Sequence, residues 1–141
     1  MSQGKRLAEI VAAHAHREGP LLPILHDVQA AFGCIDREAE ATIALALNLS
    51  RAEVRGVVSF YHDFRVEADP RPEVQLCRAE ACQARGVEAL VPAAEAAAGD
   101  RVRLSTAYCL GLCSVGPNAR VGDDLFARLD EAALVKLIEA A

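Results

Sequence analysis

The sequence predicts an α+β chain in which a small helical bundle precedes a domain of strands and helices. Apolar residues recur at helical spacing up to about residue 58, and the period then changes to two. Alanine is abundant and aromatic residues make up only 4% of the chain, which favours helix. A stretch rich in proline, residues 69–72, lies between the two regions. We therefore expect a bundle over residues 1–65 and a second domain over residues 72–141.

Four short helices are predicted in the first domain, over residues 7–14, 21–32, 37–47 and 51–58. Gly33 is expected to end the second helix. Asp36 is the expected N-cap of the third, and Ser50 with Glu53 forms a capping box that opens the fourth. Alternating apolar residues over 60–66 then predict an extended segment that leaves the bundle. No residue of these helices indicates catalysis.

The second domain is predicted to run in the order strand, helix, strand, strand, strand, helix. The first strand ends at Cys77, and the second starts near Val102 and leads toward Cys109. The helix between them contains Pro92, which should kink or shorten it. A hairpin about residues 122–124 and a last helix capped by Asp130 complete the order. A βαβ unit followed by a ββα unit is the thioredoxin-like arrangement, so both cysteine pairs should follow parallel strands at one sheet edge.

Four of the five cysteines form two pairs. Cys77 and Cys82 are separated by four residues, and Cys109 and Cys113 by three, with 26 residues between the pairs. We expect these pairs in loops, because a spacing of five fits one face of a helix poorly. Four thiolates select zinc or an iron–sulfur cluster, and Gly111 would let backbone amides turn toward sulfur. Structural zinc and thiol–disulfide chemistry remain alternatives, although no C-x-x-C redox pair is present.

Charge and hydropathy limit the setting of the protein. The formal net charge is −5, and no basic run interleaved with aromatic residues appears, which argues against a nucleic-acid partner. No apolar stretch approaches the roughly 20 residues of a membrane span, and the charged residues near the N-terminus interrupt any signal peptide. We expect a cytoplasmic protein whose paired cysteines hold a metal rather than form disulfides.

Three stretches of the chain resemble one known family. LLPILHDVQAAFGCID, VRGVVSFYHDF and the cysteine pattern with CLGLC are similar to the thioredoxin-like 2Fe-2S ferredoxin subunits. Those subunits partner a flavin-containing, NADH-oxidising subunit in complex I, in NAD-linked hydrogenases and in NAD-dependent formate dehydrogenases. The string FYHDFR resembles the formate dehydrogenase gamma subunit most, because the complex I member carries a threonine after the tyrosine.

The resemblance implies a non-catalytic electron-transfer subunit of an NAD-dependent oxidoreductase complex, with formate dehydrogenase favoured. It implies one 2Fe-2S cluster with two thiolates on each iron, held by Cys77, Cys82, Cys109 and Cys113. FMN, NAD and the molybdenum cofactor are expected only on the partners, a flavin- and NAD-binding subunit and a larger catalytic subunit. Residues 1–65 are expected to dock to these partners.

The sequence departs from the family pattern in two places. The segment between the cysteine pairs is short, because residues 98–100 run almost directly into the second strand. Cys34 stands where the family has a tyrosine, and we expect it to be a small buried residue.

Three alternatives to a formate dehydrogenase subunit stay open. They are the equivalent hydrogenase or complex I subunit, a free-standing ferredoxin, and a structural zinc module.

Overall fold

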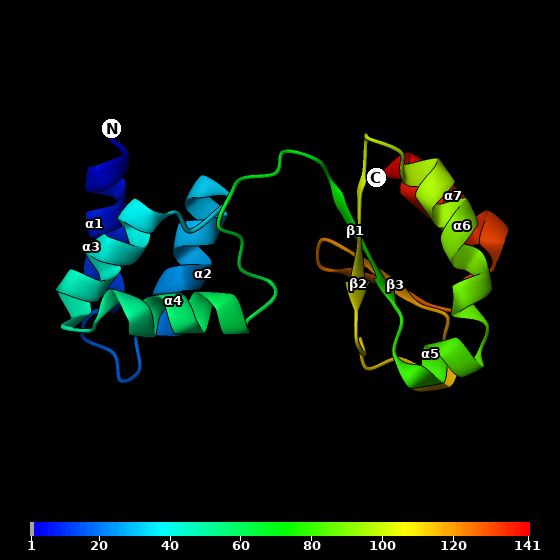
Figure 1. Ribbon diagram of the computed structural model, residues 1–141, viewed down its shortest axis with the longest axis horizontal. Helices are drawn as coiled ribbons and strands as arrows, with labels where there is room; N and C mark the ends of the chain where they lie inside the picture. Colours follow the sequence, from blue (N-terminus) through cyan, green and yellow to red (C-terminus); the bar gives the residue numbers. More distant parts are fainter. Residues whose placement is uncertain (1) are drawn as a thin grey trace. The chain divides into compact units, whose positions relative to one another are not determined.

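The computed structural model describes residues 2–141, and the chain divides between Pro70 and Arg71 into two compact units (Figure 1). Each unit buries its own set of apolar side chains. The division falls inside the proline-rich stretch at residues 69–72. Among residues 2–141, no helix is both long enough and apolar enough to cross a membrane.

The first unit consists of four helices whose ends follow local sequence signals. They are α1 (Gln3–His14), α2 (Leu21–Phe32), α3 (Arg37–Leu47) and α4 (Arg51–Phe60). Gly33 ends α2 with a φ of 79°, as predicted. The Asp36 side chain accepts a hydrogen bond from the amide of Ala39 at 2.8 Å, and the capping box at the start of α4 is complete. The predicted caps are therefore confirmed.

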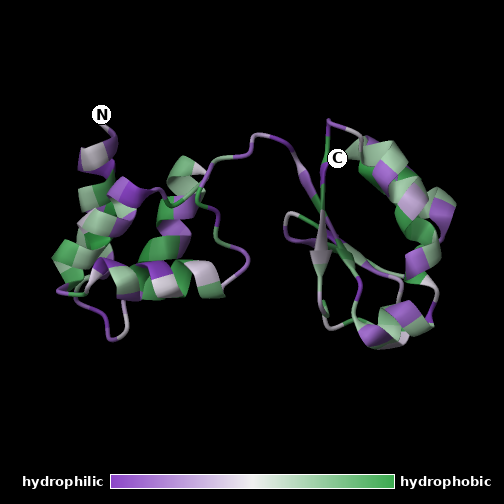
Figure 2. Cartoon of the chain, in the orientation of Figure 1, coloured by the Kyte–Doolittle hydropathy of each residue, from purple (hydrophilic) through white to green (hydrophobic). Residues whose placement is uncertain are grey.

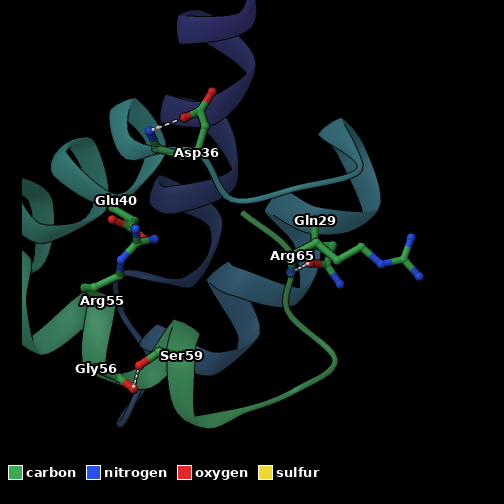
Figure 3. Close-up of polar contacts among 8 residues, drawn as sticks. Gln29, Asp36, Glu40, Arg55, Gly56, Ser59 and Arg65 are labelled. Carbon is green, nitrogen blue, oxygen red and sulfur yellow. Dashed lines mark hydrogen bonds and ion pairs between the residues drawn. The ribbon is translucent and has the colours of Figure 1, made fainter. Parts of the chain in front are cut away.

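The core of the first unit lies where the apolar stripes of the four helices meet. Ile24, Val28 and Ile43 are fully buried there, and the helices of this unit carry both hydrophobic and hydrophilic residues (Figure 2). Glu40 is also buried, and Arg55 donates a hydrogen bond to its carboxylate at 2.7 Å (Figure 3). This pair joins α3 to α4.

The segment after α4 is not extended, so that prediction is wrong. Phe60 is the last residue of α4, and the chain turns at once, with the amide of Phe64 donating to the carbonyl of Tyr61 at 3.1 Å. Phe64 is buried against the ring of His26, with ring centroids 4.9 Å apart. The apolar alternation therefore reflects a turn that returns one aromatic side chain to the core. The side-chain oxygen of Gln29 accepts a hydrogen bond from the backbone amide of Arg65 at 2.6 Å, which holds the turn in place (Figure 3).

The second unit contains a mixed four-stranded sheet in the order β2-β1-β3-β4. Its elements are β1 (Glu73–Cys77), α5 (Glu80–Ala84), α6 (Val87–Ala98), β2 (Arg103–Ala107), the 3₁₀ helix η1 (Cys113–Val115), β3 (Ala119–Val121), β4 (Asp124–Phe126) and α7 (Glu131–Ala140). β1 pairs in parallel with β2 and antiparallel with β3. The α+β, thioredoxin-like fold class is confirmed.

The two faces of this sheet differ in polarity. Val74 and Leu76 of β1 are buried in the core with α6 and α7, which lie side by side (Figure 1). The alternate β1 residues carry polar contacts: Ser105 donates to Glu73 at 2.7 Å, and Arg120 donates to Gln75 at 2.9 Å. The period of two in the sequence therefore separates a core face from a hydrogen-bonded polar face.

Pro92 does not shorten α6, contrary to that part of the prediction. The helix continues through Pro92 to Ala98, where Gly99 ends it. Proline inside a helix removes one hydrogen bond and costs about 3 kcal/mol. Ala94 and Ala98, beyond the proline, are buried in the core of the second unit. This packing stabilises the last turns of the helix despite the lost hydrogen bond.

Candidate metal centre

Both cysteine pairs lie at the carboxyl edge of the parallel strands β1 and β2. Cys77 is the last residue of β1 and pairs in register with Ala107, the last residue of β2. Cys109 follows Ala107 by two residues. Parallel strands end at the same edge, so the fold brings residues distant in sequence to one site, as predicted.

The first pair is buried. Cys77 and Cys82 are each about 1% exposed, and both pack in the core of the second unit. Cys82 does not lie in a loop, because it is the third residue of the five-residue helix α5. The chain leaves β1 at Cys77 and begins α5 at Glu80, so the two cysteines occupy different elements. The expected loop setting is therefore wrong for Cys82. A spacing of five is unfavourable only for one helix that carries both cysteines on the same face.

The second pair is exposed and close together. The sulfurs of Cys109 and Cys113 are 3.5 Å apart, and both residues are exposed. Cys109 has a φ of 90° and Gly111 a φ of 80°. A residue other than glycine held at positive φ costs of order 1–3 kcal/mol of conformational free energy, and such strained residues cluster at functional sites. The turn directs the amide of Gly111 to the sulfur of Cys109 at 3.4 Å, as the glycine predicted.

Shifts in thiol pKa show that the two pairs act on each other. Burial opposes ionisation of Cys77, but hydrogen bonds from the amides of Ala79, Leu110 and Cys109, and from the thiol of Cys82, together lower its pKa. Two of these amides come from the loop of the second pair. Amides from the β1–α5 connection and from the loop of the second pair therefore converge on the sulfur of Cys77.

In contrast to Cys77, the thiols of Cys82 and Cys113 have raised pKa values. Burial, followed by the hydrogen bond with Cys77, raises the pKa of Cys82. The hydrogen bond with Cys109 and the charge of that thiol raise the pKa of Cys113, and the charge of Cys77 adds to this rise. Each thiolate makes the next harder to form, as expected for like charges in one place. A bound cation removes this opposition, so the donor set suits a positively charged metal group.

The four thiols form two pairs, one buried and one exposed. A tetrahedral zinc site would need all four thiolates around one ion. A group with two irons and two thiolates on each iron matches the pairs.

Gly116 and Asn118, which follow the second cysteine pair in the chain, complete the wall of the site. A Cβ placed on Gly116 would lie 2.9 Å from the sulfur of Cys82, so this position has no room for a larger side chain. Asn118 is 1% exposed, and its amide nitrogen lies 3.4 Å from the same sulfur. Asn118 is not among the predicted site residues, because an asparagine after Gly-Pro is typical of a turn. A polar residue directly before the apolar start of β3 is the signal that could have found it.

Other cysteine and carboxylate positions do not belong to this site. Cys34 lies in the first unit and is half-buried, so its predicted burial is only partly met. Asp123 lies in the turn of the β3–β4 hairpin, and Asp124 begins β4 opposite Val121. The predicted hairpin is confirmed.

Comparison with known proteins gives the family. The sequence model of the thioredoxin-like [2Fe-2S] ferredoxin family matches residues 7–141, which include both cysteine pairs and nearly the whole first unit. The chain belongs to this family. Ferredoxins of this family carry a [2Fe-2S] cluster, and the sulfur grouping described above fits such a cluster.

Relatives of this ferredoxin-family chain include components of several complexes. One of them, a subunit of the NADH-quinone oxidoreductase of Rhizobium meliloti (strain 1021), is 30% identical over 99% of this chain and 89% of its own length. Another, the HndA subunit of the NADP-reducing hydrogenase of Solidesulfovibrio fructosivorans, is 24% identical over 95% of this chain and 84% of its own.

A crystal structure of NAD⁺-reducing [NiFe]-hydrogenase in the air-oxidized state matches 84% of the chain, with a TM-score of 0.70 and 28% identity. The match covers only 22% of that hydrogenase chain. In that protein the same fold therefore forms part of a much longer polypeptide.

Proposed function

We propose that this chain is an electron-transfer subunit that holds one [2Fe-2S] cluster on Cys77, Cys82, Cys109 and Cys113. The observation that carries the proposal is the meeting of two thiol pairs at one sheet edge in a chain of this family. A cluster of this kind takes up and releases one electron at a time, at about −400 mV in ferredoxins of the plant type with four cysteine ligands. The chain itself needs no nucleophile or base for this role.

The unequal exposure of the two pairs indicates the face of the site through which electrons would enter and leave. The buried pair sits in the core, which keeps water from that side of the site. The exposed pair lies on the surface next to Tyr108, a residue that is 76% exposed. A partner that carries the electron donor or acceptor would approach over Tyr108 and the loop of Cys109 and Cys113.

We infer that the partners belong to an NAD-linked oxidoreductase in the cytoplasm, and that the complex is a molybdenum-containing formate dehydrogenase. The string FYHDFR, at residues 60–65, supports this choice through its resemblance to the gamma subunit. Flavin, NAD and molybdenum cofactor would then reside on other subunits. The named relatives favour a second candidate, the equivalent subunit of a hydrogenase or of an NADH-quinone oxidoreductase.

The first unit would serve as the docking domain. Leu45 and Phe60 are 86% and 75% exposed, which is unusual for large apolar side chains on a small domain. A groove of about 580 Å³ is lined mainly by apolar residues of the same unit, among them Leu22, Leu47 and Val57. Burial of such surface against a partner subunit would stabilise a complex.

Metal analysis and magnetic resonance test the cluster. Anaerobically purified protein should contain two irons and two acid-labile sulfides per chain, with a one-electron paramagnetic signal only after reduction by dithionite. Stoichiometric zinc without that signal would contradict the proposal. In the purified native complex, formate should reduce the cluster if the complex is a formate dehydrogenase. Reduction by hydrogen or NADH, but not by formate, would favour the second candidate.

A matched pair of variants tests docking. Phe60→Asp removes an exposed apolar side chain from the end of α4 and should reduce co-purification with the larger subunits. Ala13→Asp, at an exposed position of α1, should leave co-purification unchanged. Both proteins should retain full iron content. Deleting residues 1–65 should likewise leave the cluster in place and abolish co-purification, and a complex that survives this deletion would contradict the docking role.

A further inference from the structure

Asn118 combines deep burial with an incompletely satisfied side chain. Glu40 and Asn118 are the buried polar side chains among residues 2–141. The carboxylate of Glu40 is paired with Arg55, whereas the amide oxygen of Asn118 has no hydrogen-bond partner. An unsatisfied buried acceptor destabilises the folded protein. An apolar side chain would avoid this cost, so another interaction of Asn118 must offset it.

The amide nitrogen of Asn118 contacts both halves of the metal centre. It donates to the sulfur of Cys82 at 3.4 Å and to the carbonyl oxygen of Leu112 at 3.2 Å. Leu112 directly precedes Cys113. Since a carbonyl oxygen can only accept, the contact with Leu112 fixes the orientation of the amide group. Both N–H bonds of the side chain are therefore used, one toward each cysteine pair.

The backbone of Asn118 adds a third contact. Its carbonyl oxygen accepts a hydrogen bond from the amide of Cys77 at 3.0 Å. One residue thus links the last residue of β1, the sulfur on α5 and the loop that leads into η1. The residues that take part in these contacts span 41 positions of the chain, from Cys77 to Asn118. No local sequence signal therefore sets their relative positions.

We propose that Asn118 is a positioning residue that holds the sulfur of Cys82 and raises the reduction potential of the [2Fe-2S] group. This inference rests on the proposed function. Reduction adds one electron, supplied by dithionite in the test below, and requires no proton and no change in ligand bonds. The added negative charge is shared by the ligand sulfurs, so an N–H donor at Cys82 stabilises the reduced form more than the oxidised form.

Two variants of the full-length protein test the proposal. Asn118→Leu has similar volume and no donor, and Asn118→Asp keeps the shape but places an acceptor beside the sulfur. At a fixed solution potential, the ratio of reduced to oxidised protein should fall about three- to tenfold in Asn118→Leu, and at least as much in Asn118→Asp. A tenfold change corresponds to about 59 mV for a one-electron couple. The ratio is measured by magnetic resonance during a dithionite titration.

Val102→Ala is the matched control, because Val102 is buried in the same unit and precedes β2, at the other end of the strand from Cys109. It should keep the wild-type ratio and iron content. Loss of iron from both Asn118 variants, with iron retained in the control, would also support the positioning role. Full iron with an unchanged ratio in the Asn118 variants would overturn the proposal, as would an equal shift or loss in the control. Absence of iron and sulfide from the wild type would instead refute the proposed function.

Discussion

Gly116→Ala tests whether the site has room only for hydrogen beside the sulfur of Cys82. The backbone at Gly116, with φ −70° and ψ 166°, is open to any residue, so alanine introduces no backbone strain. Its Cβ would lie 2.9 Å from the sulfur and 3.3 Å from the Cδ atom of Arg85. An ordinary contact needs about 3.5 Å or more, so the sulfur, the backbone at residue 116 or both must shift by about 0.6 Å in total.

A movement of this size exceeds what metal ligation tolerates. Distances in a metal site are held to within about 0.2 Å, so Gly116→Ala should lose most of its iron and sulfide. Overpacking should also lower the unfolding free energy of the second unit by about 1–3 kcal/mol. Iron and sulfide analysis with magnetic resonance measures the first effect, and guanidinium denaturation measures the second.

Gly56→Ala provides the control for this substitution. Gly56 lies inside α4, and no heavy atom lies within 4 Å of a Cβ built there. Alanine should leave the iron content unchanged and stabilise the first unit by up to about 1 kcal/mol, because it is the better helix former. If Gly116→Ala retained two irons, two sulfides and the wild-type signal, the sulfur of Cys82 would not be held against Gly116 as a ligand, and the reasoning would be refuted.

Three further predictions concern the ligands and the first unit. Serine at any of the four proposed ligands should sharply lower iron content, whereas Cys34→Ser should keep it; equal loss at Cys34 would contradict the ligand set. Arg55→Ala should lower the unfolding free energy of the first unit by about 1–3 kcal/mol, because the carboxylate of Glu40 stays buried without its partner; an unchanged denaturation midpoint would show that water replaces the arginine. The backbone amide of Ser50, and then its hydroxyl, hold the pKa of Glu53 below its ordinary value. The stability from this lowered pKa is therefore complete above the unfolded value of about 4.3 and is lost as pH falls through the folded one, so thermal denaturation of Ser50→Ala should depend less on acid pH than that of the wild type.

Local sequence signals predicted most of the secondary structure. The caps at Asp36, Ser50 and Asp130 and the helix end at Gly33 all lie where the sequence places them. Such signals act within about four residues, since a cap bonds its own first turn. The failure at residues 60–66 has the same origin, because an alternating pattern cannot show that Phe64 packs on His26, 38 positions earlier.

The cysteine pattern determined by itself which residues could form a metal centre and which edge of the sheet would carry it. The order of strands and helices was enough for this, because parallel strands end at one edge. Tertiary structure alone decided that one pair is buried and the other exposed, that Cys109 adopts positive φ, and that Gly116 and Asn118 enclose the sulfur of Cys82. The contacts of Gly116 and Asn118 with Cys82 join segments more than 30 residues apart, and packing rather than local propensity sets such contacts.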